Sequence, residues 1–276
     1  MGKKNIPETG IYDARELGAG KMLLLGFQHM FAMFGATVLV PILTGLDVSN
    51  TLLFAGLGTL LFHLITGGKI PAFLGSSFAF LGGYATIAPM LGEKQNIPNL
   101  EMLPYACFGV ACAGLVYVIL AGLFKAFGAK KVMRFFPPIV TGPIIIAIGL
   151  SLSSSAVNNC EANWPVALVA ILVVIVCNIW GKGMIKIIPI LLGVIGSYLL
   201  AVIFDADTRA NLVANVSAAK WFALPIKMEQ TVFGLFASGS VDGHKLLTAA
   251  ITIVPLSLAT MVEHIGDMCA ISSTCE

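Results

Sequence analysis

The sequence predicts an all-α polytopic membrane protein, and three observations support this fold class. Hydrophobic residues make up 58% of the 276-residue chain and charged residues only 11%, whereas soluble domains carry roughly 25% charged residues. The mean hydropathy is +0.93, and a soluble protein of this length could not bury so much apolar surface. Apolar segments long enough to span a bilayer, or nearly so, recur along the whole chain.

Eight such segments follow one another, and each is expected to cross the membrane. The first 20 residues are polar and are expected to lie in the cytoplasm. The second segment is short and is compatible with a tilted helix or a thinner region of membrane. In chain order the predicted spans are Met22–Leu43, Thr51–Thr66, Pro71–Met90, Met102–Phe124, Pro137–Ala156, Trp164–Trp180, Ile187–Phe204 and Lys245–Ile271.

The distribution of basic residues agrees with this order, because cytoplasmic loops carry an excess of Lys and Arg. With the amino terminus inside, three of the five basic residues on the outer side fall in one long loop, Asp205 to His244, whose charges count least, and a fourth, Lys245, directly follows it. The inner side then holds Lys3, Lys4, Arg15, Lys21, Lys69, Lys125, Lys130, Lys131, Arg134, Lys182 and Lys186, and the outer side holds Lys94, Arg209, Lys220, Lys227 and Lys245.

The third span is a poor helix. From Pro71 to Tyr84 it holds one proline, three glycines and the adjacent Ser76 and Ser77. Irregular backbone inside a membrane is tolerated only where it lines a cavity or is buried in protein, so interrupted spans point to a substrate site near the midplane. A kinked helix that packs through small residues is the alternative interpretation.

The eighth span carries three ionisable residues, Glu263, His264 and Asp267. A carboxylate near the bilayer centre costs about 2.5 kcal/mol or more on insertion scales. Glu263 and Asp267 are four residues apart and therefore share a helical face. These residues are the strongest candidates for a functional site.

Other spans divide into candidate site and scaffold. The first span carries His29, which is a functional candidate or a hydrogen-bonded structural histidine. Three prolines and a glycine from Pro137 to Pro143 predict a broken start to the fifth span. Spans six and seven look like structural scaffold. Phe27-Gln28-His29-Met30 weakly resembles Val262-Glu263-His264-Ile265, which suggests a seven-span repeat whose second copy is inverted.

Three motifs resemble one transporter family. Gln28 to Pro41 is similar to the first-span signature of bacterial uracil permeases, which belong to the nucleobase–ascorbate (nucleobase–cation symporter) transporters. Gly75-Ser76-Ser77-Phe78-Ala79-Phe80 resembles their third span, and Glu263-His264-Ile265-Gly266 resembles their eighth. The resemblance implies 14 spans in two inverted repeats of seven, with a short strand in the broken third span.

The family fold implies a division of this chain into domains. A core domain of spans 1–4 and 8–11 moves against a gate domain of spans 5–7 and 12–14. We therefore expect a cytoplasmic segment at 1–20, core spans at 21–128, gate spans at 129–204, an extracytoplasmic loop at 205–244 and span eight at 245–276. Spans 9 to 14 are absent, so we expect the chain to be the front of a longer protein that is inactive alone.

The resemblance also implies roles for individual residues. Glu263 corresponds to the carboxylate that binds the base, and Phe78 to the aromatic residue that packs on its ring, with Ser77 beside it. His29 belongs to the polar cluster of span one that supports the carboxylate. Some relatives have His where this chain has Asp267, so proton coupling is assigned to Glu263 and Asp267 together.

The expected function is import of uracil or a related nucleobase with protons, in the cell membrane. An anion transporter or channel of the same architecture is the alternative, although two carboxylates at the site would repel an anion. No enzyme motif is present, and no cofactor, metal or nucleic-acid partner is expected. The six cysteines show no metal-ligand spacing. The sequence is compatible with a homodimer. It does not decide between uracil and xanthine as the substrate.

Overall fold

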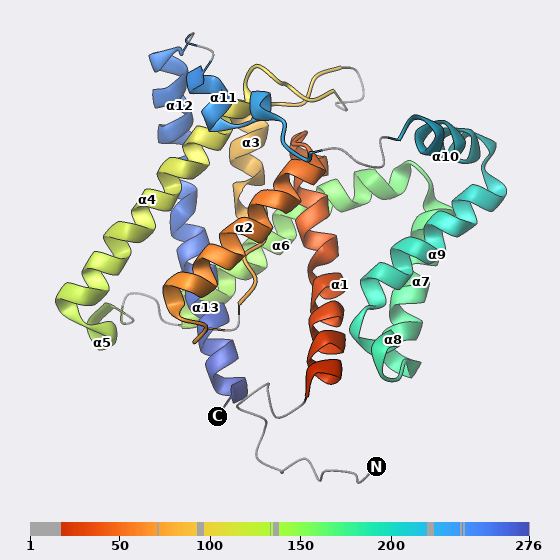
Figure 1. Cartoon of the computed structure of the whole chain (residues 1–276), viewed down its shortest axis with the longest axis horizontal. Helices are drawn as coiled ribbons and strands as arrows, with labels where there is room; N and C mark the ends of the chain where they lie inside the picture. Colours follow the sequence, from red (N-terminus) through yellow and green to blue (C-terminus); the bar gives the residue numbers. More distant parts are fainter. Residues whose placement is uncertain are drawn as a thin grey trace. The chain divides into compact units, whose positions relative to one another are not determined.

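The computed structural model of the chain is mostly helical (Figure 1). It describes residues 18–70, 72–92, 97–132, 134, 138–219, 224–237, 239 and 241–275. The expected cytoplasmic residues 1–17, together with Pro71 and Pro137, lie outside this part. The described residues divide into two compact units: the first contains those within 18–35, 153–219 and 272–275, and the second contains those within 36–152 and 224–271.

The first unit is built on two apolar helices that pack against each other, α7 (Trp164–Trp180) and α9 (Pro189–Phe204). A Cβ added to Gly193 would lie 2.6 Å from Cγ2 of Val174. The missing side chain therefore lets the two backbones approach closely, as small residues do between membrane helices.

The seventh span was predicted to begin at Ile187, but that residue ends the short helix α8 (Met184–Ile187). Helix α9 begins two residues later at Pro189. Proline is accepted at the first helical position because its missing N–H would have no intrahelical partner there. The break at Ile188 therefore has a local cause.

A further helix, α10 (Ala206–Ala218), lies within the segment predicted as a long outer loop. The Asp205 side chain caps its start. The Arg209 guanidinium donates to two backbone carbonyls in the last turn of α9, at 3.1 Å and 2.9 Å. A cation is favourable at a helix C-terminus, so these contacts stabilise the 108° bend between the two helices.

The second unit holds the elements that carry the candidate site. Helices α4 and α12 run side by side, with α3 packed against both (Figure 1). Two long helices, α1 (Ala19–Thr44) and α6 (Pro138–Glu161), contribute to both units. The remaining helices of the second unit are α2 (Val48–Thr66), α3 (Leu81–Ile87), α4 (Leu103–Phe127), α5 (Ala129–Val132), α11 (Val232–Ala237), α12 (Gly243–Ile253) and α13 (Ser257–Cys275), with 3-10 turns η2 (Phe78–Phe80), η4 (Met228–Gln230) and η5 (Val254–Leu256).

The fifth span does not have the broken start that its prolines predicted. Helix α6 is continuous from Pro138 and contains Pro143. Pro138 occupies the first helical position, where the lost N–H costs nothing. Pro143 lies inside α6 and removes one backbone hydrogen bond there, yet the helix continues through it. The predicted break is therefore absent from residue 138 onward.

The third span is interrupted, as predicted. Residues 72–77 have no regular secondary structure and lead into η2 and α3. The Thr59 hydroxyl accepts a hydrogen bond from the backbone N–H of Leu74 at 3.1 Å and lies 3.3 Å from the Leu74 carbonyl oxygen. The Thr59 side chain of α2 thus supplies the hydrogen-bond partners that the Leu74 backbone would have found within a regular helix.

The short strand expected in this span is not formed among the described residues. Ser77 has the extended backbone of a strand, with φ −93° and ψ 131°. A strand, however, needs a neighbour to accept and donate its backbone hydrogen bonds. The only pairing in the described part of the chain is an isolated bridge between Leu91 and Ile97.

A buried cluster fixes the third span against the eighth. Ile253 of α12 is fully buried at its centre. A Cβ on Gly83 of α3 would lie 2.9 Å from Ile253, and a Cβ on Gly109 of α4 would lie 2.8 Å from both Ile253 and the Ala249 carbonyl oxygen. The two glycines therefore allow α12 to lie directly against α3 and α4.

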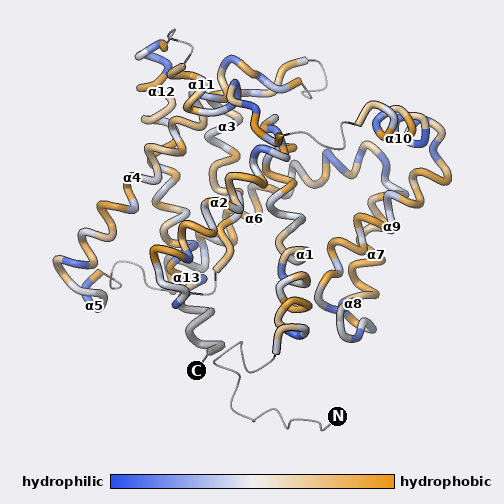
Figure 2. Tube along the Cα trace, viewed as in Figure 1, coloured by the Kyte–Doolittle hydropathy of each residue, from blue (hydrophilic) through white to orange (hydrophobic). Residues whose placement is uncertain are grey.

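Four of the described helices are long and apolar enough to cross a membrane. Figure 2 shows α4, α7 and α9 as largely hydrophobic along their length. In the last of the four, 33% of the apolar window is buried against the rest of the protein, compared with 6% in the first, so span eight is the more enclosed. The four are Val48–Thr66, Leu103–Phe127, Gly142–Glu161 and Gly243–Met268. The number of eight membrane spans stays a prediction.

The segment before span eight is attached to the start of α2. Lys227 Nζ lies 2.6 Å from Asp47 Oδ2. The Asp47 backbone N–H donates to Gln230 Oε1 at 2.7 Å, and the Asn50 amide donates to the Lys227 carbonyl at 3.3 Å. Because Asp47 also caps α2, one carboxylate stabilises both the helix start and this contact.

This attachment is expected to weaken at acidic pH. The hydrogen bond from Lys227 holds the pKa of the Asp47 carboxyl below its ordinary value of 3.8. The contact is therefore fully stabilised above that value and is lost as the pH falls through the lowered pKa. Hydrogen exchange of the Asp47 amide, corrected for its intrinsic pH dependence, should show protection at pH 7 that disappears on acidification.

Asp47→Asn should show reduced protection at pH 7 and no further acid-dependent loss. Glu101→Gln is the control, since Glu101 pairs with Lys245 at 2.6 Å, away from this contact. Protection that persists unchanged in Asp47→Asn would contradict the role given to the carboxylate.

Candidate functional site

Span eight is a broken helix, in which η5 separates α12 from α13. Pro255 lies in this 3-10 turn, and proline has no N–H with which to continue the α-helical ladder. The start of the span is held by Asp242, which caps α12 and whose backbone N–H donates to the Tyr105 hydroxyl at 3.1 Å. The candidate residues all lie on α13, after the break.

The polar residues of α13 occupy one face of the helix. Thr260, Glu263, His264 and Asp267 are spaced at i, i+3, i+4 and i+7, which places them in one stripe. Thr260 is buried and Glu263 is partly buried, whereas His264 and Asp267 are exposed. Asp267 and His264 both interact electrostatically with Glu263.

Ser77 and Glu263 were predicted from sequence to share a site, and the structure brings them together. The Ser77 side chain lies close enough to the Glu263 carboxylate for the two to interact. The Ser77 oxygen accepts from the Ala79 backbone N–H at 3.3 Å, which leaves the hydroxyl proton available for a further acceptor. Phe78 follows directly, opens η2 and is partly buried. The irregular third span thus meets the carboxylate of the eighth.

Tyr117 of α4 is a member of this cluster that the sequence did not predict. Its hydroxyl donates to Thr260 Oγ1 at 2.7 Å and lies 2.8 Å from His264 Nδ1, with the two rings 5.5 Å apart. A tyrosine within an apolar span needs a partner for its hydroxyl. This requirement could have indicated from the sequence that Tyr117 takes part in a hydrogen bond, but it does not identify the partner.

The hydrogen bonds around Tyr117 determine which nitrogen of His264 carries a proton. The Thr260 hydroxyl donates to the Ser257 carbonyl at 3.0 Å, so it accepts from Tyr117. The Tyr117 proton is thereby used, and His264 Nδ1 must act as the donor to the phenolic oxygen. Neutral His264 then keeps Nε2 free of a proton and able to accept one.

Tyr117→Phe is expected to remove both hydrogen bonds at once. The loss of two bonds should lower the stability by about 1–3 kcal/mol, since one such bond contributes about 0.5–1.5 kcal/mol, and it should release His264 from the Nδ1-protonated form. Thermal unfolding and ¹⁵N NMR shifts of His264 measure the two effects. Tyr198→Phe, at an exposed ring on α9, is the control, and identical behaviour of the two variants would contradict the network.

Ser257 adds a buried polar atom at the start of the same helix. Its side chain is fully buried, and its hydroxyl oxygen has no hydrogen-bond partner in the described part of the chain. Such groups are rare in folded proteins and call for a structural or functional explanation. Its place at the head of the polar stripe is consistent with a site that handles polar groups.

The other predicted residues are placed as follows. His29 lies on α1 within the first unit, and its side chain is exposed; its membership of the Glu263 cluster stays a prediction. Among the described residues, no group of three or more His, Cys, Asp or Glu side chains could hold a metal ion.

Long apolar helices and interrupted spans define a multi-pass membrane protein, and the comparisons with known proteins define its family. The family model described as "Permease family" matches residues 20–276. The chain belongs to this family. The resemblance to uracil permeases that the motifs predicted is confirmed.

Individual relatives cover nearly all of the chain. It is 39% identical to the uracil permease of Bacillus caldolyticus over 280 residues, which cover 97% of this chain and 59% of the relative. The uracil permease of Bacillus subtilis (strain 168) is also 39% identical, over 89% of this chain and 54% of its own length. The putative pyrimidine permease RutG of Escherichia coli (strain K12) is 34% identical over 98% and 59%. The chain thus spans between half and three fifths of the length of these relatives.

Proposed function

We propose that this protein acts in the import of uracil or a related nucleobase across the cell membrane by proton-coupled secondary transport. The observation that carries the proposal is the meeting of Ser77, in the interrupted third span, with Glu263 of span eight. Similarity to uracil permeases supports the substrate class.

The chemistry of the base fits these side chains. Uracil presents ring N–H donors flanked by carbonyl acceptors, and an ionised carboxylate accepts from such donors. Glu263 would bind the N–H groups, and the Ser77 hydroxyl orients the carboxylate. Phe78, one residue further on, offers the flat base an apolar stacking surface. His29 of span one would support the carboxylate, as the family resemblance implies.

Proton coupling would use the stripe on α13. Asp267 lies four residues from Glu263 on the same face of the helix. Glu263 and Asp267 would share the transported proton. His264 stands beside them with an available Nε2.

Transport by alternating access requires two bodies that move. Helices α2, α3, α4, α12 and α13 fall in one compact unit and α7 and α9 in the other, in agreement with the proposed core and gate, whereas the first part of α1 and most of α6 do not follow that division. In this proposal the amino terminus lies in the cytoplasm.

An anion transporter of the same architecture is the competing proposal. A broken helix can direct its positive end toward an anion. Glu263 and Asp267 on the same face oppose this use, because their charges would repel the ligand.

Uptake of radiolabelled uracil by vesicles from cells that express the gene separates the two proposals. Unlabelled uracil should compete and sulfate should not, and a protonophore should abolish accumulation. Competition by sulfate, or accumulation that survives collapse of the pH gradient, would overturn the nucleobase or the proton assignment respectively.

A further inference from the structure

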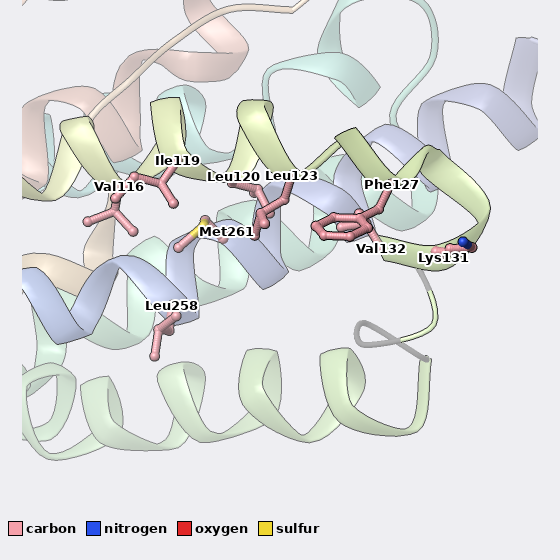
Figure 3. Close-up of a pocket in the computed structure, with 9 residues that line it drawn as sticks. All are labelled: Val116, Ile119, Leu120, Leu123, Phe127, Lys131, Val132, Leu258 and Met261. Carbon is pink, nitrogen blue, oxygen red and sulfur yellow. The ribbon is translucent and has the colours of Figure 1, made fainter. Parts of the chain in front are cut away.

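An apolar groove runs along α4 toward α5 in the second unit (Figure 3). Its volume is about 610 Å³. One wall is a stripe of α4 at helical spacing, and the other comes from α13. The residues that shape it are Val116, Leu120, Leu123, Phe127, Leu258 and Met261.

The groove has a cation at one end. Among the described residues that line it, Lys131 of α5 alone is charged (Figure 3). Lys125, Lys130 and Arg134 lie within a few residues, and the sequence holds no acidic residue between Glu101 and Glu161. None of these four basic side chains forms a salt bridge within the described residues.

We propose that this groove binds an anionic glycerophospholipid, with an acyl chain along α4 and the phosphate at Lys131. From Val116 to Phe127 the helix rises about 17 Å at 1.5 Å per residue. This is close to half of the roughly 30 Å hydrocarbon core, so the groove matches one leaflet. Basic pockets between membrane helices bind anionic headgroups.

The charge distribution favours a lipid over a second copy of the chain. Two copies inserted in the same direction and related by an axis along the membrane normal would bring both basic clusters to the same depth. Like charges at that face oppose association. A phospholipid supplies an apolar chain and an anionic end in one molecule, and it matches both features of the groove. This site does not depend on the transported substrate.

Native mass spectrometry of the 276-residue chain in a mild detergent tests the proposal. The chain is offered equal amounts of phosphatidylglycerol and phosphatidylcholine with identical acyl chains. We expect phosphatidylglycerol to be retained about fivefold more, the effect of one lysine at an anionic headgroup. Lys131→Gln should bring the ratio close to one, whereas Lys182→Gln should leave it unchanged.

A second pair of variants tests the apolar part. Leu123→Trp fills the groove and should reduce bound phosphatidylglycerol, whereas Leu115→Trp, on another face of α4 and exposed, should not. Equal retention of the two lipids, or equal effects of Lys131→Gln and Lys182→Gln, would overturn the proposal. A dimer that Leu123→Trp dissociates, with no preference for phosphatidylglycerol, would assign the groove to a second copy instead.

Discussion

Replacement of Glu263 by glutamine is expected to reduce uracil uptake by about 10- to 100-fold in cells that express the gene. Glutamine keeps the size of the side chain but replaces an ionised acceptor by a neutral amide. Hydrogen bonds to charged groups contribute about 1.5–3 kcal/mol, and each 1.4 kcal/mol is a factor of ten. The variant also loses the carboxylate that would exchange a proton with Asp267.

Two controls separate this effect from a loss of folded protein. Glu229→Gln removes an exposed carboxylate in η4 and should leave uptake unchanged. The amount of Glu263→Gln protein in the membrane, measured by immunoblot, should equal that of the wild type. Uptake by Glu263→Gln at the wild-type rate, with equal expression, would remove Glu263 from the site.

A valine at Gly109 is expected to destabilise the second unit more than any surface change. Its Cβ would lie 2.8 Å from both the Ala249 carbonyl oxygen and Ile253 Cδ1. The backbone oxygen cannot move aside without displacing α12, and overpacking of this kind costs about 1–3 kcal/mol or more. The displacement would also move span eight, and with it Glu263, relative to Ser77.

Gly114→Val is the matched control, because it lies on the same helix and a Cβ there meets nothing within 4 Å. Both variants carry the same change in helix propensity, so the difference between them isolates packing. Recovery of folded protein by gel filtration after heating should show a clearly lower midpoint for Gly109→Val. Equal midpoints would contradict the close approach of α4 and α12.

Local chemistry explains which parts of the fold the sequence predicts well. Asp47 accepts from the Asn50 N–H at 2.9 Å and caps α2, and Gly67 ends that helix in the left-handed region, with φ 62°. Aspartate is a preferred capping residue at the start of a helix, and glycine is a preferred residue just after its end. The start of α10 carries a capping residue of the same type, Asp205. The polar residues around it nevertheless led to the prediction of a loop.

Pairings between distant residues explain what sequence could not predict. Tyr117 and His264 are 147 positions apart, and no local pattern relates them. The extended backbone before Phe78 was predicted as a strand, yet a strand depends on a second segment whose position is not encoded locally. The meeting of Ser77 with Glu263 was predicted through family resemblance, whereas Gly83, Gly109 and Ile253, which hold those spans together, were not.

Equilibrium binding of radiolabelled uracil to membranes that contain the expressed protein tests the central claim most directly, because it measures the site without the transport cycle. The proposal predicts saturable binding that unlabelled uracil displaces, that sulfate does not displace, and that Glu263→Gln abolishes. Binding of uracil to Glu263→Gln with wild-type affinity would contradict the claim that the carboxylate of span eight holds the base.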